Sequence, residues 1–116
     1  MRYGLLIYTN EADRPAWGTP EGDAEAQVYG ALQAEMIDTN VFRSGDPFLR
    51  VSEAKSVQVK DGATQVSDGP AVDTPIQLGG YYIVECDTID QATALAAKIP
   101  AAAYGKIEVR PVLEFS

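Results

Sequence analysis

The chain has 116 residues, 46% of them hydrophobic and 22% charged, and its 9 Lys and Arg against 17 Asp and Glu give a formal net charge of −8 at pH 7. This length and composition are typical of one globular domain, residues 1–116, and exclude a disordered chain. The acidic balance excludes a nucleic-acid-binding protein, because affinity for polyanions depends on clustered cations. With one cysteine and no histidine, the chain forms no intrachain disulfide and uses no imidazole mechanism.

The composition also argues against membrane insertion and a resident metal. No run approaches the roughly 18 apolar residues that a membrane helix needs, and the apolar segment near the N-terminus is too short for a secretory signal. Structural zinc sites draw on several Cys and His ligands, which this chain lacks. We therefore expect a cytoplasmic protein with no metal, no cofactor and no membrane partner.

The first third of the chain predicts a strand followed by a helix. Residues 3–9 are apolar and rich in β-formers, which indicates a buried strand, and residues 11–19 contain the Pro and Gly of a loop. Thr19-Pro20 is typical of a helix start. Apolar residues then recur at helical spacing and predict a helix over 20–39: Val28, Tyr29, Leu32 and Met36.

The middle of the chain predicts a hairpin. Residues 40–52 are interpreted as irregular. Valines alternate with polar residues on both sides of Asp61-Gly62, a dipeptide that favours a tight turn. The hairpin ends at residues 68–70 (Asp-Gly-Pro), because proline cannot donate to a β-ladder. Residues 71–78 are expected to form a connector.

The last third predicts a strand, a helix and a strand. Gly79-Gly80 leads into the apolar segment 81–86, and Thr88 followed by Gln91 is the capping-box pattern of a helix that stops at Pro100. Residues 105–115 alternate like a strand. The complete order is strand, helix, hairpin, strand, helix, strand. It predicts an α+β ferredoxin-like sandwich with an antiparallel sheet and two helices on one face.

Apolar side chains occur on both faces of this predicted sheet. Because side chains alternate across a strand, one face carries Tyr3, Leu5 and Ile7, and the other carries Leu6, Tyr8, Tyr81 and Ile83. Two helices cover only one face. The uncovered patch exceeds the few hundred Å² that monomers usually leave exposed. We therefore predict a homodimer in which two sheets pack face to face.

Two charged residues of the last strand indicate a polar cleft between these sheets. Ile107 and Val109 are expected to face the helices, which leaves Glu108 and Arg110 on the inter-sheet side. Charges there are costly unless they are paired or solvated. The two residues either orient an anionic ligand through the guanidinium or form a structural ion pair at the dimer seam.

Three further candidates each have two interpretations. Tyr8 and Tyr81 either line a ligand pocket or serve as interface aromatics. Asp68 is either a carboxylate at the mouth of a cleft or the cap of its own turn. Gly79-Gly80 either lets a ligand approach the backbone or eases entry into a crowded strand.

Two other residues are expected to be structural. Cys86 lies on the helix-facing side of its strand, and a reactive thiol needs exposure and electropositive neighbours. Trp17, in the loop before the first helix, is expected to pack rather than to bind a ligand.

Five motifs occur in order along nearly the whole chain: YGLLIY at the start, VSDGP (66–70), QLGGYYIVECDTIDQA (77–92), AAKIP (96–100) and GKIEVRPVLEF (105–115). In these motifs the chain resembles the DGPF subgroup of the YCII-related family. The resemblance implies a dimeric α/β barrel formed by two ferredoxin-like units. It also implies a link to regulation by extracytoplasmic-function sigma factors, because genes of the subgroup often lie beside theirs.

The chain departs from that family at its namesake motif. Ala71 replaces the usual phenylalanine, and residues 73–76 (Asp-Thr-Pro-Ile) lack the usual lysine and a glutamate. The wider family is noted for a His–Asp pair proposed to be catalytic, whereas this chain has no histidine. A histidine-dependent lyase or dehydrochlorinase activity is therefore not carried over.

The sequence leaves two functions open. The favoured hypothesis is a non-catalytic homodimer that binds a small anionic or aromatic molecule or acts in regulation, because no nucleophile–base pattern is found. The alternative is a cofactor-free isomerase or lyase acting on a small organic substrate. In that case Asp68 or Glu108 is the general base, and Arg110 or Tyr81 stabilises developing negative charge.

Overall fold

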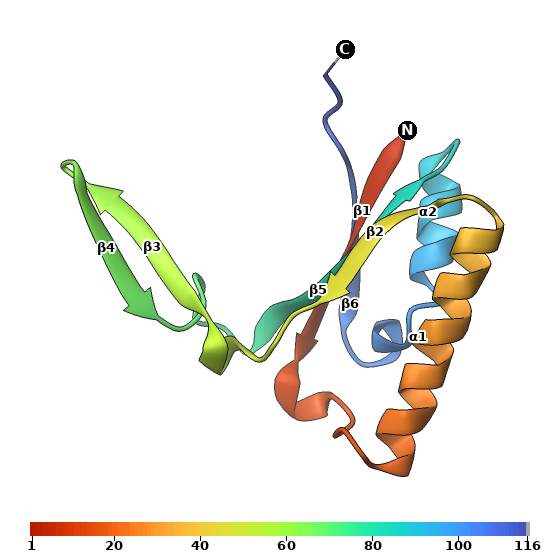
Figure 1. The fold of residues 1–116 in the computed structure, drawn as a ribbon, viewed down its shortest axis with the longest axis horizontal. Coiled ribbons are helices and arrows are strands. Elements are labelled where there is room, and N and C mark those ends of the chain that lie inside the picture. The colour runs from red at the N-terminus through yellow and green to blue at the C-terminus, as the bar shows by residue number, and fades with distance from the viewer. Residues whose placement is uncertain (116) are drawn as a thin grey trace.

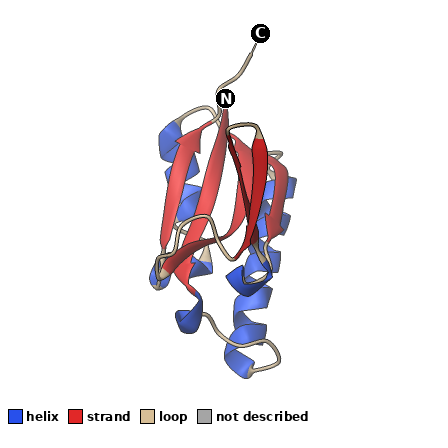
Figure 2. Cartoon of the chain, turned by 90° about the vertical axis from the view of Figure 1, so that its left-hand side faces the viewer, coloured by secondary structure: helices blue, strands red, loops and turns tan. Residues whose placement is uncertain are grey.

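The computed structural model describes residues 1–115 and shows a four-stranded antiparallel sheet with two helices on one face (Figures 1 and 2). The elements are β1 (Arg2–Asn10), α1 (Pro20–Asp38), β2 (Phe42–Pro47), β3 (Lys55–Lys60), β4 (Ala63–Asp68), β5 (Ile76–Glu85), α2 (Ile89–Ala96) and β6 (Lys106–Pro111), with short 3-10 turns η1 (Glu11–Asp13), η2 (Val51–Glu53) and η3 (Pro100–Ala103). The sheet order β2-β5-β1-β6 is that of a ferredoxin-like sandwich and confirms the predicted α+β class. The sheet is open, and no closed barrel forms within residues 1–115.

The core lies between the helices and the central strands β1 and β5. Leu5 pairs with Tyr82 across these strands, and the two side chains face the helices. Tyr3 and Val84, also paired, are buried beside them. Ile107 and Val109 of β6 pack against the same core, as predicted. Burying each such side chain contributes about 1.5–3 kcal/mol, so this face provides most of the fold's stability.

Both helices start where the sequence predicts. The Thr19 hydroxyl accepts the Gly22 N–H at the start of α1 (3.1 Å), and the Thr88 hydroxyl accepts the Gln91 N–H at the start of α2 (3.2 Å). Each bond satisfies a backbone donor that a helix leaves without an internal partner. Helix α1 ends at Asp38, and Asn40 then adopts a positive φ of 60°.

One strand was not predicted. Residues 42–47, interpreted as irregular, form the edge strand β2, which pairs with β5 through Phe42 with Val84 and Asp46 with Tyr81. Gly45 and Pro47 lower the strand propensity of this segment, but an edge strand tolerates proline at its end, and pairing with β5 outweighs local preference.

The hairpin β3–β4 forms where predicted but belongs to a separate two-stranded sheet. Its turn residues Asp61 and Gly62 both have positive φ (51° and 77°), which suits a two-residue hairpin loop. Figure 1 shows the hairpin projecting away from the main sheet on the side opposite the helices. The predicted order placed the hairpin as the second strand unit of the sandwich. That prediction is wrong, because β2 occupies this place in the main sheet.

Three boundaries also differ from the sequence analysis. Strand β5 begins at Ile76, inside the segment predicted as a connector. Helix α2 ends at Ala96, and a 3-10 turn carries the chain past Pro100. Strand β6 ends at Pro111, so residues 112–115 lie outside the predicted strand because proline stops the ladder. No helix among residues 1–115 is long and apolar enough to cross a membrane.

Candidate functional site

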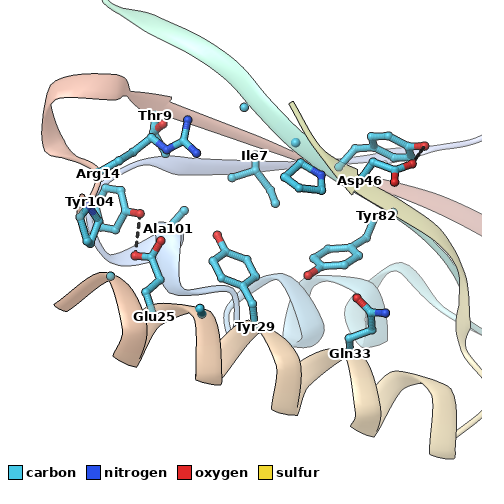
Figure 3. A pocket seen from close by; sticks show the side chains of 18 of the residues that line it. Ile7, Thr9, Arg14, Glu25, Tyr29, Gln33, Asp46, Tyr82, Ala101 and Tyr104 are labelled. Atoms are coloured by element: carbon cyan, nitrogen blue, oxygen red, sulfur yellow. Dashed lines mark hydrogen bonds between the residues drawn. The ribbon is translucent and has the colours of Figure 1, made fainter. Parts of the chain in front are cut away.

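A cavity of about 290 Å³ lies between α1 and the helix-facing side of the sheet (Figure 3). Its walls come from β1, the loop before α1, α1 from Gly22 to Gln33, β5 and the turn η3, with β2 at one edge. This volume is at the small end of the range of ligand pockets. One chain forms this cavity alone, whereas the predicted cleft between two sheets needs a second copy.

A carboxylate and a phenol are hydrogen-bonded inside the cavity. The Tyr104 hydroxyl, from the segment after η3, donates to Oε2 of Glu25 on α1 at 2.8 Å (Figure 3). Both side chains are half-buried, and no Lys or Arg within residues 1–115 forms an ion pair with Glu25. Burial and then the Glu25 hydrogen bond raise the pKa of Tyr104, so the phenol stays protonated as a donor.

Two more phenols reach the cavity from opposite walls. Tyr29 lies one helical turn after Glu25 on α1, and Tyr82 extends from β5; Figure 3 shows both hydroxyls in the space between helix and sheet. Burial, followed by the negative charge of Glu25, raises the pKa of Tyr29 to about 12. Burial also raises the pKa of Tyr82. These rings give the cavity an apolar lining with neutral hydroxyl groups at its surface.

The guanidinium of Arg14 lines the cavity next to Gly79. Arg14 follows η1 in the loop before α1 and is half-buried. Within residues 1–115 its guanidinium forms no ion pair, whereas those of Arg2, Arg43 and Arg110 pair with glutamates. A Cβ on Gly79 would lie 3.7 Å from Arg14 Nη1, 3.9 Å from the Ile7 carbonyl oxygen and 4.0 Å from the Thr9 hydroxyl oxygen. The missing side chain of Gly79 therefore leaves space beside three polar groups.

This glycine is the extra residue of a β-bulge. Ile7 pairs with Gly80 and Tyr8 pairs with Leu78, so Gly79 has no partner in β1. Bulges redirect side chains and interrupt pairing, and they are frequent beside active sites. The interpretation of Gly79-Gly80 as strand entry is wrong, because β5 begins at Ile76 and both glycines lie inside it, in the cavity wall.

The mouth of the cavity carries a tryptophan. Trp17 lines it and is 87% exposed, so the expectation that this side chain packs is wrong. At another edge, the Tyr81 hydroxyl donates to Asp46 Oδ2 at 3.1 Å, and the Tyr81 ring stacks on Phe48 with 5.8 Å between ring centroids.

Of the five residues named from the sequence, the structure joins Glu108 with Arg110 and places only Tyr81 at the cavity. Tyr81 borders the cavity, whereas Tyr8 lies half-buried on β1 and is not in the cavity wall. Arg110 donates to Glu108 at 3.0 Å on β6, in a pair that is largely exposed. Asp68 lies at the end of the hairpin, where it pairs with Lys55. No two of the five share the cavity.

Sequence reasoning missed Arg14, Glu25 and Tyr104. Glu25 belonged to an acidic stretch that suits a solvated helix face, and Tyr29 fitted the apolar stripe of the same helix. A signal was present in their spacing, since residues four apart lie on one face of a helix. Arg14 and Tyr104 come from loops far apart in sequence, and only the fold brings them to α1.

The chemistry available in the cavity is that of an arginine, a carboxylate and several phenols. Within residues 1–115 no three His, Cys, Asp or Glu side chains gather as a metal site would require. Cys86 is buried away from the cavity, as expected, and burial raises the pKa of its thiol. The cavity can therefore bind charged and hydrogen-bonding groups of a ligand.

Comparison with known proteins assigns a family to the chain but no activity. The family model of the YCII-related domain matches residues 1–116. An uncharacterized protein of Rhizobium meliloti is 28% identical over 114 residues, which cover 97% of this chain and 92% of that protein.

Proposed function

The chain belongs to the YCII-related domain family, and from this premise we propose that it is a small-molecule-binding protein whose ligand occupies the cavity between α1 and the sheet. The observation that carries the proposal is the half-buried Arg14 guanidinium, which faces the cavity without an ionic partner in residues 1–115. Leaving a partly buried charge without a partner is costly, and a ligand anion would supply the partner.

The lining supports a ligand with an apolar body. Ile7, Tyr29 and Tyr82 present hydrocarbon and ring surface, while hydroxyl groups provide hydrogen bonds at fixed places. A mostly apolar pocket with a few convergent polar groups is typical of small-molecule sites. The cavity of about 290 Å³ limits the ligand to a small organic molecule.

We propose that the protein acts as a homodimer through the other face of the sheet. Figure 2 shows that no helix covers this face, and Leu6 and Ile83, which alternate with the buried Leu5 and Val84, are half-buried. The projecting hairpin adds exposed apolar surface, since Val57, Val59 and Val66 are each at least 60% exposed. An isolated two-stranded hairpin is marginally stable in water, so contact with a second copy would stabilise it. A regulatory role beside a sigma factor, and membership of the DGPF subgroup, remain predictions from the resemblance.

The experiment that tests ligand binding uses Trp17, the chain's single tryptophan, as the reporter. Its place at the cavity mouth predicts that an occupant changes its fluorescence. A panel of small carboxylic acids, amino acids, amines and neutral aromatics is titrated into the full chain. Saturable binding that Arg14→Gln weakens and Arg110→Gln leaves unchanged supports the proposal. No saturable response to any member, or equal loss in both variants, contradicts it.

The observation that favours an enzyme is the Glu25 carboxylate beside protonated phenols. A carboxylate in a partly dry cavity can accept a proton from carbon, and neighbouring phenols can donate to the oxyanion that forms. The alternative function is thus a cofactor-free isomerase or lyase, with Glu25 in the place that sequence reasoning gave to Asp68 or Glu108. Deuterium exchange at the α-carbon of a bound carbonyl compound, lost in Glu25→Gln, is its test.

A further inference from the structure

We infer that the ligand is a zwitterion of the α-amino-acid type, with its carboxylate on Arg14, its ammonium group on Glu25 and an apolar side chain between Tyr29 and Tyr82. The inference rests on the proposed binding function and specifies the chemical class of the ligand. It follows from two opposite charges that face one cavity and do not pair with each other.

The positive end of the site is Arg14 beside Thr9. The open position above Gly79 is 3.7 Å from Arg14 Nη1 and 4.0 Å from the Thr9 hydroxyl oxygen, measured from the Cβ that glycine lacks. The Ile7 carbonyl oxygen lies 3.9 Å from the same point. A carboxylate oxygen displaced from that point toward Arg14 and Thr9, and away from this carbonyl, would accept hydrogen bonds from both donors. The planar guanidinium favours carboxylates, because two parallel N–H groups match their two oxygens.

The negative end is Glu25 on the opposite wall. Its Oε2 accepts the Tyr104 hydroxyl, which orients the carboxylate, and Oε1 accepts no hydrogen bond within residues 1–115. An ammonium group could donate to that oxygen. Tyr104 remains a donor to the carboxylate and does not compete as an anion, since burial raises its pKa.

The separation between these ends explains why the ligand carries both charges. Arg14 and Glu25 line the same cavity (Figure 3). Among the ion pairs of residues 1–115, none joins these two side chains within 4.0 Å. An anionic ligand would pair with Arg14 but be repelled by Glu25. A cationic ligand would pair with Glu25 but be repelled by Arg14. A zwitterion satisfies both charges at once.

The rest of the cavity fits an apolar side chain. Tyr29 and Tyr82 approach from the helix and the sheet, and Ile7 faces the same space from the sheet side (Figure 3). Aromatic rings give large apolar contact at low entropic cost, and they pair favourably with other aromatic rings. A hydrophobic amino acid of modest size is therefore favoured over a charged one.

The test compares three molecules that share one side chain: L-phenylalanine, phenylpropanoate, which lacks the ammonium group, and phenethylamine, which lacks the carboxylate. Matched sets for leucine and methionine extend the series. Titration of Trp17 fluorescence, checked by calorimetry, measures each affinity. We expect at least one amino acid to bind at least about tenfold more tightly than both of its single-charge analogues, because charge-assisted hydrogen bonds are lost.

Two variants assign each charge to its residue. Arg14→Gln should weaken phenylalanine and phenylpropanoate but not phenethylamine, and Glu25→Gln should weaken phenylalanine and phenethylamine but not phenylpropanoate. Gly79→Ala keeps every charge and fills the carboxylate position, so it should mimic Arg14→Gln. Thermal unfolding of each variant, with Arg110→Gln as the control, separates loss of binding from loss of folding.

Three outcomes overturn the inference, and they differ in what they leave standing. If phenylpropanoate binds as tightly as the amino acid and Arg14→Gln weakens it, the zwitterion assignment fails, but the proposed binding function stands. If phenethylamine or a neutral aromatic binds at least as tightly as the amino acid and Arg14→Gln leaves that binding unchanged, both proposals fail, because no ligand anion pairs with Arg14. If nothing in the full panel binds, both proposals fail together.

Discussion

The two faces of the main sheet carry similar apolar side chains but meet different surroundings. Leu5 faces the helices and has no exposed surface, whereas its neighbour Leu6 faces the other way and is only half-buried. Val84 and Ile83 repeat the contrast on β5. The helix-covered face combines the core with a cavity, and the open face combines an apolar patch with the exposed Glu108–Arg110 pair.

This contrast shows that an apolar strand face does not by itself locate a site. The cavity occurs on the better-covered face, at the end where Gly79 interrupts pairing and where Gly80 and Gly45 keep β5 and β2 close. The open face has more free surface but presents its charged pair as a closed ion pair in which Arg110 and Glu108 satisfy each other. Its features suit contact with another chain, as proposed above.

The largest expected effect on stability comes from replacing the buried one of the two neighbouring leucines with alanine. Leu5→Ala should lower the free energy of unfolding by about 2–5 kcal/mol, because it opens a void in a fully buried site. Leu6→Ala should cost clearly less at low protein concentration. Denaturant unfolding measures both. Equal losses would show that the open face is as well packed within one chain as the covered one.

A concentration series sharpens the same comparison. If two copies cover the open face, the cost of Leu6→Ala should grow with protein concentration, while that of Leu5→Ala should not. A sedimentation mass equal to one chain at micromolar concentration, together with a concentration-independent Leu6→Ala effect, would contradict the proposed dimer.

Replacing one glycine on each face with alanine is expected to have the next largest effect on stability. A Cβ on Gly45 would lie 2.5 Å from Tyr82 Cδ1 and 2.9 Å from the Tyr81 carbonyl oxygen, so Gly45→Ala should cost about 1–3 kcal/mol through overpacking. A Cβ on Gly4 would meet Leu6 and Ile83 at 3.7–3.8 Å, ordinary contact distances. Gly4→Ala should therefore be tolerated. Thermal unfolding of the two variants decides whether the faces differ in free space.

Alkaline pH should destabilise the covered face. Burial raises the pKa of Tyr29 to about 12, above the ordinary value of 10.0, so between these pH values the unfolded chain has lost a proton that the folded chain keeps. The resulting stability is complete below pH 10 and is lost as the pH rises toward 12. Tyr29→Phe should reduce the slope of this dependence, measured as unfolding free energy against pH, but not abolish it, because the pKa values of Tyr82 and Tyr104 are raised as well. An unchanged slope would show that the Tyr29 hydroxyl is not responsible.

The smallest effect is expected on the open face. Arg110→Gln removes an exposed ion pair to Glu108, which is worth at most about 1 kcal/mol in unfolding. It should also leave ligand binding unchanged. A larger loss of unfolding free energy that appears only at high protein concentration would place the pair in an interface between two chains. This is the dimer-seam interpretation given in the sequence analysis.

Local patterns predicted most of the fold. The alternation around Asp61-Gly62, the caps at Thr19 and Thr88, and the apolar runs of β1 and β5 correspond to elements of the structure. Strand β2 was missed because its stability comes from pairing with β5 rather than from its own residues. The separation of the hairpin from the main sheet was missed for the same reason, since alternation predicts a strand but not its partner.

The site was harder to predict than the fold. Its polar groups come from a loop, a helix and the segment after a 3-10 turn, at Arg14, Glu25 and Tyr104, and no short motif joins them. Glu108 and Arg110 attracted attention because two residues apart on a strand are neighbours by simple geometry. That geometry is present, and it produces an ion pair rather than an open site.

The most direct test of the account locates the ligand on one face of the sheet. Amide NMR spectra of the full chain are recorded during titration with the tightest-binding amino acid of the series. We predict that the largest shift changes occur at Thr9, Gly22 and Gly79 around the cavity. Changes concentrated at Leu6, Glu108 and Arg110 would place the ligand on the open face and contradict the account.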